Sequence, residues 1–271
     1  MIPEFYGDKC VIMAHRGACV YAPQNTLPAF KKAFEMGFTS FETDVHCTKD
    51  GQIVLCHDYK IDKVSDGIGF ITDYTLDKLR SFDFGSYFSD DFKNTPIPTL
   101  EELLDLTEEY TTGGIMNIEL KPVKHGESEI AEKVINAVKR RGLLPRLLIS
   151  SFDAELLLRA KKHENAVHTA LIYPGFNNGF TTYFTPPINK VKSYGIYAIH
   201  PFLKYLDGRK VNWAHNLGIK IAPWTVNGKA DINYALRLGC DAVISDYPER
   251  VREAVNSREQ KKLGIKPVKK K

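Results

Sequence analysis

Short apolar runs alternate with amphipathic stretches along almost the whole chain. The runs rich in β-branched and aromatic residues predict eight strands, at residues 11–15, 38–45, 114–120, 146–152, 167–173, 196–200, 220–226 and 241–246. Helical periodicity between them stops at Gly37, Gly142, Gly218 and Gly239, where a glycine in the left-handed conformation can close a helix. A capping-box spacing of threonine and glutamate predicts a further helix over 99–110.

This alternation predicts a parallel sheet that is covered by helices. Strands buried on both faces have near-continuous apolar sequences, as these do. Eight strand–helix units in about 250 residues suit a closed (β/α)8 barrel, the TIM barrel. An open doubly wound sheet is the alternative, but no GxGxxG pattern follows the first strand. We therefore expect a single barrel domain over residues 1–257.

Two segments depart from the alternation. Residues 58–98, after the second strand region, hold no clear strand–helix unit, and so long a loop in a compact domain is usually a functional insertion. We expect its aromatic side chains mainly to pack, although this segment and residues 173–184 are also candidates for a lid. Residues 258–271 carry seven basic residues and one acidic residue, which predicts a flexible basic C-terminal tail.

The tail changes the meaning of the overall charge. Its net charge of +6 accounts for more than the +4 of the chain, so residues 1–257 carry −2, which argues against a nucleic-acid-binding face. No window approaches the roughly 18 consecutive apolar residues of a membrane span, so no stable membrane insertion is expected. The first ten residues lack the pattern of a secretory signal. Five cysteines without metal-finger spacing indicate free thiols in a reducing compartment, and we expect a cytoplasmic protein.

Polar side chains gather at the predicted carboxyl ends of the strands, where barrels carry their chemistry. Because strand side chains alternate, Glu42 and Asp44 point the same way, and so do Glu119 and Lys121. Three clustered carboxylates repel one another unless they share a cation or a proton. Hard oxygen ligands favour Mg²⁺ or Ca²⁺ over zinc. A divalent-cation site at Glu42, Asp44 and Glu119 follows as a hypothesis, and salt bridges to Arg16 and Lys121 are the purely structural alternative.

A predicted hairpin brings a histidine to the same place. Asp50 and Gly51 form a turn signal between apolar runs. If they are the centre of the turn, His57 lies opposite Asp44, and if the centre slips by one residue, His57 lies opposite Glu42. Directly opposed residues have Cβ atoms roughly 5 Å apart, so both registers place His57 beside the acidic pair.

Together these residues suggest phosphoester cleavage. His15 ends the first strand, so two imidazoles, His15 and His57, are available as acid and base at neutral pH. Arg16, Lys121 and a metal ion would stabilise a phosphate group that gains charge in the transition state.

The chain also resembles a known family, the glycerophosphodiester phosphodiesterases. The matching pieces fall in the family's order and span nearly the whole chain apart from the tail: HRG at 15–17, PQNTLPAF at 23–30, ETDV at 42–45, TKDG at 48–51, HD at 57–58, IPTLEELL at 97–104, IELKP at 118–122, WTVN at 224–227 and SDYPE at 245–249. One departure is visible, because the family usually has PENT where this chain has PQNT. If Gln24 orients Arg16 or a histidine, the lost charge would alter rates more than the identity of the reaction.

The resemblance implies a (β/α)8 barrel, one divalent cation, and hydrolysis of small-molecule glycerophosphodiesters to sn-glycerol 3-phosphate and an alcohol. It further implies that His15 and His57 are the acid/base pair, that the acidic trio holds the metal, and that Arg16 and Lys121 hold the phosphate. One histidine would deprotonate a glycerol hydroxyl that attacks phosphorus, the other would protonate the departing alcohol, and water would then open the cyclic phosphate. Which histidine is base and which is acid stays open, as does the choice between Mg²⁺ and Ca²⁺.

Other residues near the expected mouth carry weaker predictions. Trp224 is expected to form an apolar wall for the glycerol or the leaving group. His46 is expected behind the ligands or facing solvent, and His200 ends the sixth strand at the same rim, where a substrate contact is the less favoured interpretation. His125, His163, His168 and His215 have no charged constellation around them and are expected to be structural or on the surface.

Two further functions are compatible with the sequence. A phospholipase D-like enzyme would use the same chemistry on lysophospholipids at a membrane surface, to which a basic tail could be attracted. A non-catalytic barrel that binds phosphorylated ligands would have to lack one of the necessary residues, and none is missing. The leaving-group alcohol and the oligomeric state cannot be predicted from these patterns.

Overall fold

The computed structural model describes residues 5–7, 9–122, 129–173 and 188–262. Eight parallel strands form a ring: β1 (Val11–His15), β2 (Phe41–Cys47), β4 (Met116–Leu120), β5 (Leu147–Ser151), β6 (His168–Tyr173), β7 (Ala198–Pro201), β8 (Lys220–Ile221) and β9 (Ala242–Ser245). Their order is β8-β7-β6-β5-β4-β2-β1-β9. Backbone hydrogen bonds from Asp241 to Ile221, from Ile244 to Pro223 and from Val226 to Ile244 join the two ends. The predicted (β/α)8 barrel is confirmed.

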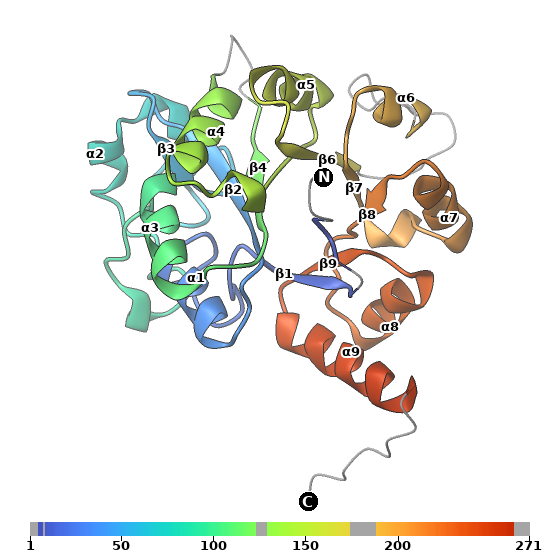
Figure 1. Cartoon of the computed structure of the whole chain (residues 1–271). Coiled ribbons are helices and arrows are strands. Elements are labelled where there is room, and N and C mark those ends of the chain that lie inside the picture. Colours follow the sequence, from blue (N-terminus) through green and yellow to red (C-terminus); the bar gives the residue numbers. More distant parts are fainter. Residues whose placement is uncertain (1–4, 8, 123–128, 174–187, 263–271) are drawn as a thin grey trace, which may run out of the picture.

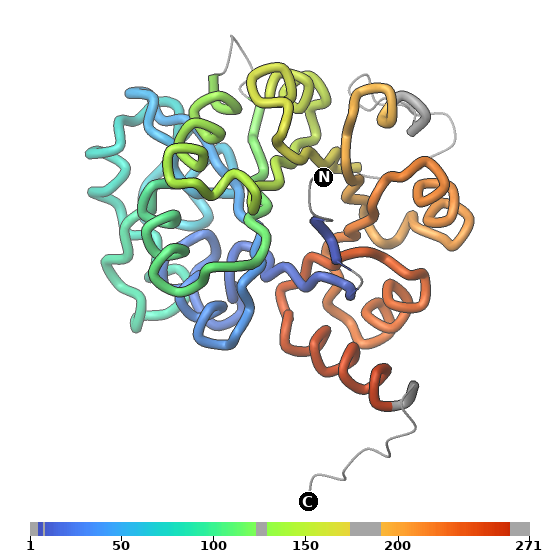
Figure 2. Tube along the Cα trace, in the orientation of Figure 1, coloured from blue at the N-terminus to red at the C-terminus, as the bar shows by residue number. Residues whose placement is uncertain are grey.

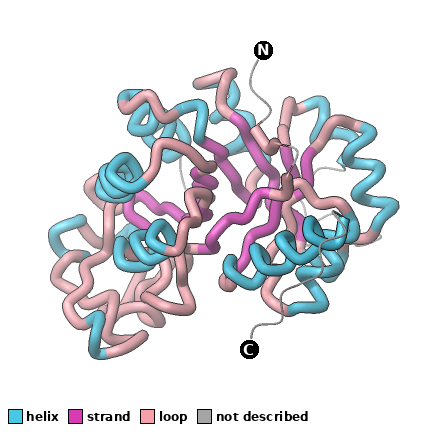
Figure 3. Tube along the Cα trace, turned by 60° about the horizontal axis from the view of Figure 1, so that its bottom comes forward, coloured by secondary structure: helices cyan, strands magenta, loops and turns pink. Residues whose placement is uncertain are grey.

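Helices surround this ring on its outer side (Figure 1, Figure 3). They are α1 (Leu27–Glu35), α3 (Leu100–Tyr110), α4 (Ile130–Arg140), α5 (Ala154–His163), α6 (Ile188–Ser193), α7 (Gly208–Asn216), α8 (Lys229–Leu238) and α9 (Pro248–Lys262). Thr99 and Glu102 form the predicted capping box at the start of α3. Gly37, Gly142, Gly218 and Gly239 all have positive φ angles, as expected where the helical pattern stops. No helix in the described part of the chain combines the length and the apolar composition that crossing a membrane requires.

The interior of the barrel is mostly apolar toward the amino-terminal ends of the strands. Met13, Leu148, Ala170 and Ala242 belong to one buried cluster there. The fully buried Tyr6 packs in the same cluster, because the segment before β1 crosses this opening of the ring (Figure 2). One end of the barrel is thus filled, and chemistry is left to the carboxyl ends of the strands.

The segment 58–98 lies to one side of the ring, near α3 (Figure 1). It contains the short helix α2 (Leu76–Leu79) and two single 3-10 turns, Ile71–Asp73 and Asp90–Phe92. Its apolar side chains Ile61, Ile71 and Phe84 form a small core of their own with Val54 of the hairpin strand β3 (Ile53–Leu55). Other aromatic side chains, such as Phe70, are exposed, so the expectation of packing holds only in part.

The predicted hairpin exists, but both predicted registers are wrong. Cys47 pairs with Ile53 and Val45 with Leu55. The turn has three residues rather than two and ends at Gly51, whose φ is +78°. Cys56, not His57, therefore lies opposite Asp44, and its backbone N–H donates to the Asp44 carbonyl at 3.1 Å. β3 ends at Leu55, so His57 is free of the strand's side-chain alternation when it approaches the acidic pair.

At the carboxyl terminus the chain stays regular beyond the expected domain boundary. α9 continues to Lys262, into the segment that the charge pattern separates from the body of the chain. The remaining basic residues, and the candidate lid at 174–184, lie outside the described residues.

Candidate active site

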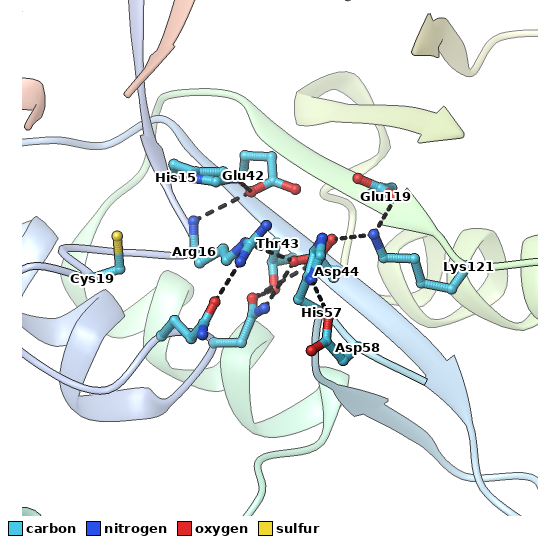
Figure 4. A network of polar contacts seen from close by, with 12 residues as sticks. His15, Arg16, Cys19, Glu42, Thr43, Asp44, His57, Asp58, Glu119 and Lys121 are labelled. Carbon is cyan, nitrogen blue, oxygen red and sulfur yellow. Dashed lines mark hydrogen bonds and ion pairs between the residues drawn. The ribbon is translucent and has the colours of Figure 1, made fainter. Parts of the chain in front are cut away.

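The register of the strands brings the predicted polar residues together at one end of the barrel. His15 on β1 is paired with Glu42 on β2, and Asp44 on β2 is paired with Glu119 on β4. Figure 4 shows these side chains converging from three neighbouring strands, with His57 approaching from the hairpin. The site is therefore a direct consequence of parallel pairing.

Arg16 turns the chain out of the first strand. Its φ of +55° lies in the left-handed region, and its backbone N–H contacts a Glu42 side-chain oxygen at 3.2 Å. Its Nε lies 3.3 Å from Asp44 Oδ2, and its Nη1 donates to Gln24 Oε1 at 2.5 Å. Gly17 follows with φ +80°, and a Cβ there would lie 2.7 Å from the Ala29 backbone. The HRG sequence thus ends a strand, aims a guanidinium and begins a tight turn.

The three carboxylates form one buried cluster. Oxygen atoms of Glu42, Asp44 and Glu119 all lie within 4.8 Å of one another. Asp44 is 1% exposed, and Lys121 Nζ lies 2.7 Å from its Oδ1 while also donating to Glu119. Asn25 Nδ2 donates to Asp44 Oδ2 at 2.8 Å. Both interpretations of the sequence are thus present at once, an acidic trio and salt bridges to Arg16 and Lys121.

The electrostatics distinguish the three acids. Burial and the charges of Asp44 and Glu119 raise the pKa of Glu42 well above its ordinary value. Burial and the Asp44 charge raise the pKa of Glu119 to about 7. Burial alone would raise the pKa of Asp44 too, but Lys121 and Arg16 outweigh it and hold that pKa below its ordinary value. Two cations neutralise one acid well and leave two short of positive charge, so the oxygen donors fit a divalent cation.

The Glu119 carboxyl should make the metal-free protein less stable as the pH rises. Its folded pKa of about 7 exceeds the ordinary 4.5, so the native state binds more protons than the unfolded state between these values. Its contribution is therefore present below about pH 4.5 and lost through pH 7. In EDTA, the free energy of unfolding measured with urea should fall by up to roughly 3–4 kcal/mol over this range, at about 1.4 kcal/mol per pKa unit. Glu119→Gln should flatten the profile, and an equally steep profile in that variant would contradict the assignment.

Asp44 should be the acid on which folding depends most. Asp44→Ala leaves Arg16 and Lys121 buried without their shared partner, which should cost about 3–5 kcal/mol in the free energy of unfolding. Asp105→Ala is the matched control, because Asp105 contacts Arg141 at 2.5 Å on the exposed surface. Such a pair should contribute less than about 1 kcal/mol. Equal losses in urea denaturation of the two variants would refute a special role for Asp44.

Each candidate catalytic histidine is held by a carboxylate. His15 Nδ1 lies 2.5 Å from Asp246 Oδ1, and His57 Nδ1 lies 2.7 Å from Asp58 Oδ1. Burial lowers the pKa of His15, and the hydrogen bond to Asp246 opposes this. Burial likewise lowers the pKa of His57, with the Asp44 charge acting in the opposite direction. In both rings Nδ1 is paired with a carboxylate, so Nε2 is the nitrogen that can exchange a proton with a substrate.

A pocket joins these groups. Five of the predicted site residues line it together with Trp224: His15, Arg16, Glu42, His57 and Glu119. Asp44 and Lys121 lie directly behind them through their ion pairs. Phe152, Ile172 and Ile244 complete an apolar wall beside Trp224. A phosphate could contact both imidazoles and the guanidinium while an organic group rests on this wall.

Comparison with known proteins decides the family. The model of the glycerophosphoryl diester phosphodiesterase family matches residues 15–250, which include every site residue above. The chain belongs to this family. It is 34% identical over 241 residues to a glycerophosphodiester phosphodiesterase of Caldanaerobacter subterraneus, with 89% of this chain and 96% of the relative covered. A putative glycerophosphodiester phosphodiesterase of Bacillus subtilis is 32% identical, with 88% and 95% covered.

Solved structures of the family share the barrel. A phosphodiesterase of Oleispira antarctica in complex with the product sn-glycerol-3-phosphate is 27% identical, with a TM-score of 0.83, and 93% of this chain and 99% of that one are covered. A putative glycerophosphoryl diester phosphodiesterase of Silicibacter pomeroyi has a TM-score of 0.81 at 24% identity, with 92% and 94% covered. The chain is accordingly a phosphoric diester hydrolase of this family, which removes the non-catalytic barrel from consideration.

Several residues that contact the candidate site were not identified from the sequence. Asp246 accepts from His15 and is itself held by Asn227 Nδ2 at 2.6 Å. Asn25 bridges Thr43 and Asp44. The only available signal for Asp246 was its place at the end of the last strand, and nothing in the pattern paired it with a residue 231 positions earlier.

Of the remaining histidines that the structure describes, two lie at or behind the pocket and three lie away from it. His46 is buried rather than solvent-facing, with Nε2 3.4 Å from the His57 carbonyl, so it supports His57 from behind. His200 lines the pocket, as the less favoured interpretation required. His163, His168 and His215 lie away from it, and His125 lies outside the described residues. All five cysteines are free.

Proposed function

We propose that the chain hydrolyses glycerophosphodiesters to sn-glycerol 3-phosphate and an alcohol, with His15 and His57 as the acid/base pair. The observation that carries the proposal is that both imidazoles line one pocket with Arg16, Glu42 and Glu119. A three-carbon diol phosphate fits such a pocket, because its phosphate needs cations and its carbon chain needs the apolar wall. The product complex of the Oleispira antarctica relative supports the same substrate class.

The residues divide the reaction between them. One imidazole takes the proton of the glycerol hydroxyl adjacent to the phosphorylated carbon, and that oxygen attacks phosphorus. The bond to the leaving oxygen breaks, and this oxygen takes a proton from the other imidazole. Water then adds to the cyclic phosphate, giving its proton to the second imidazole, while the first returns its proton to the released hydroxyl. Arg16, with Lys121 behind the acids, stabilises the added negative charge on the phosphoryl oxygens.

Glu42, Asp44 and Glu119 would hold one divalent cation, Mg²⁺ or Ca²⁺. When bound, such an ion supplies Lewis-acid stabilisation of a phosphoryl oxygen and lowers the pKa of a coordinated hydroxyl. The three acids bring the negative charge that it requires, and Lys121 keeps two of them in place.

A panel of glycerophosphodiesters, differing in the alcohol and assayed with Mg²⁺ and with Ca²⁺, tests the proposal. We expect enzymatic detection of sn-glycerol 3-phosphate with at least one member of the panel. Release of glycerol and a phosphorylated alcohol, without sn-glycerol 3-phosphate, would contradict it, because the bond cleaved would lie on the other side of phosphorus. The panel also identifies the preferred leaving group.

Asp246 is a positioning residue in this scheme. Burial would raise the pKa of its carboxyl, but the hydrogen bonds from His15 and Asn227 and the charge of His15 together outweigh this and lower that pKa to about 2, so the carboxylate accepts from Nδ1 throughout the working range. Asp246→Asn should lower kcat by about 10–100-fold with little change in KM, the usual scale for a group that orients a catalytic histidine. The pH profile of kcat should shift, since the imidazole loses its charged partner. An unchanged profile with a proportional rise in KM would instead indicate a substrate contact.

A lysophospholipid substrate is the second candidate, favoured by one observation. Ile68 on the segment 58–98 is 75% exposed, and Phe70 beside it is 46% exposed. Exposed apolar side chains of this kind can contact a lipid surface. Co-sedimentation of the full chain and of a chain ending at Lys262 with anionic liposomes would separate this substrate class from a water-soluble one.

The free cysteines support the cytoplasmic location that the sequence predicts, which stays a prediction.

A further inference from the structure

The floor of the pocket is polar, buried and without hydrogen-bond partners. Asn117, Ser150 and His200 line the pocket and are each at most 1% exposed. The amide oxygen and nitrogen of Asn117, the hydroxyl of Ser150 and Nδ1 of His200 make no hydrogen bond within the described part of the chain. Native proteins leave few buried polar atoms in this condition, and the usual explanation is a ligand or an ordered water molecule.

These three residues line the same pocket as the charged groups, and two of them are paired with acids in the sheet. The strand register pairs Asn117 with Glu42, and Ser150 with Glu119. His200 is anchored from below, because its Nε2 lies 3.4 Å from the hydroxyl of Tyr6 in the segment that fills the other end of the barrel. Alanines at positions 170 and 198 pack in the layer beneath, so small side chains leave the floor accessible.

The three residues of the floor are also uncharged, unlike the arginine and the acids that line the same pocket. Burial lowers the pKa of His200 to about 3, so its imidazole is neutral at physiological pH, as are the amide and the hydroxyl beside it. Trp224 adds no competing donor, because its Nε1 already donates to the His200 carbonyl at 2.8 Å. Neutral donors and acceptors beside an apolar wall suit an alcohol, whereas a phosphate would be drawn to Arg16, which also lines the pocket.

We propose that Asn117, Ser150 and His200 bind the terminal hydroxyl of the glycerol unit, the one that does not attack phosphorus. This inference rests on the proposed function and adds the basis of its selectivity for glycerol over simpler diols. The attacking hydroxyl must face phosphorus at the level of the histidines. The remaining hydroxyl, at the far end of a three-carbon chain, is the group that can reach the floor.

The test compares a glycerophosphodiester with the matching phosphodiester of propane-1,2-diol. The analogue keeps the attacking hydroxyl and lacks only the terminal one. For the unaltered enzyme, kcat/KM should be at least ~30-fold lower for the analogue, because a site built to bind a hydroxyl rejects a compound that lacks it. In Ser150→Ala and in Asn117→Leu this ratio should shrink at least ~5-fold, since the hydroxyl then loses a partner in the enzyme.

Thr169→Val is the matched control. The Thr169 hydroxyl is equally buried and, among the residues that the structure describes, equally without a hydrogen-bond partner, but it does not line the pocket. Its removal should leave the substrate ratio unchanged, whatever it does to stability. Thermal unfolding of each variant shows whether it is folded, and Ser150→Ala, which removes a single oxygen atom, carries the test if Asn117→Leu does not fold.

Calorimetric binding of two product analogues gives a second measurement that does not require turnover. sn-Glycerol 3-phosphate should bind more tightly than propane-1,2-diol 1-phosphate, and the difference should shrink in Ser150→Ala. Equal kcat/KM for both diesters with normal release of sn-glycerol 3-phosphate would overturn the role of the floor and leave the proposed function standing, with water as the occupant. Hydrolysis of neither diester would overturn the proposed function, and the binding comparison would then decide the floor separately.

Discussion

Removal of divalent cations with EDTA should reduce the release of sn-glycerol 3-phosphate by at least ~100-fold, the scale of several kcal/mol of charge stabilisation in the transition state. Glu42 and Glu119 have raised pKa values because of burial and of the neighbouring acids, so without an added cation the site is short of positive charge. Arg16 and Lys121 both contact Asp44, and Lys121 also contacts Glu119, but two cations do not balance three buried carboxylates. Adding back Mg²⁺ or Ca²⁺ should restore turnover, and a titration of each ion gives its affinity.

The loss should come from the reaction and not from unfolding. The buried ion pairs of Asp44 with Lys121 and Arg16 are made without any metal, so circular dichroism of the EDTA-treated protein should be unchanged. Glu119→Gln should raise the concentration of cation needed for half-maximal activity, because it removes a charged ligand. Full turnover in EDTA would refute the metal site and would leave the acidic trio as a salt-bridge network.

The barrel could be predicted from the sequence because its signals are local and repeated. Each strand has a near-continuous apolar run, and glycine or a capping box bounds several helices. The weakest strand shows the limit of this signal. Residues 220–226 read as one strand, yet regular pairing covers only Lys220–Ile221. The segment beyond contains Pro223, which has no N–H to donate, and it completes the ring through irregular hydrogen bonds instead.

The site could be predicted in part for a similar reason. Alternation along β2 and β4 is enough to place Glu42 with Asp44 and Glu119 with Lys121, and parallel pairing brings the two sets together. The hairpin register failed because it depended on one turn, in which a single extra residue moves every opposed pair. His57 reaches the site nevertheless, since the chain has left the strand by that point.

Contacts between the two ends of the chain could not be predicted. Asp246 meets His15 only because β9 pairs with β1 when the ring closes, and closure joins residues that no local pattern relates. The same is true of Tyr6 and His200, which meet inside the barrel across 194 positions. Such contacts orient the histidines of the pocket, and they can be identified only from the complete fold.

Replacement of either histidine of the proposed acid/base pair should be the most damaging single change to kcat. His15→Ala and His57→Ala should each lower kcat at least ~100-fold, the usual contribution of general acid–base catalysis, while the protein remains folded. Both rings line the pocket and are only partly enclosed, so their loss removes no buried ion pair of the kind that Asp44 makes. Stopped-time assays of the released sn-glycerol 3-phosphate, with unfolding in urea as a measure of stability, check both parts of the prediction.

His215→Ala is the matched control for these variants. His215 Nε2 contacts Asp241 Oδ2 at 2.7 Å, so it is also a histidine paired with an aspartate, but it lies outside the pocket. Its replacement should change kcat by less than ~2-fold, as for other surface changes away from the chemistry. Equal losses in all three variants would mean that His–Asp pairs matter for the fold and not for the reaction, and the acid/base assignment would fail.

The pH profiles of the two variants should also assign the roles that the sequence leaves open. The base must be neutral, so activity falls as the pH drops through its pKa, and the acid must be protonated, so activity falls as the pH rises through its pKa. Alanine at the base should therefore remove the acidic limb of the profile, and alanine at the acid should remove the basic limb. Burial lowers the pKa of both rings, so each limb should lie below the range of a free imidazole. If both variants keep both limbs, neither ring transfers the proton, and the residual activity comes from the charged groups around them.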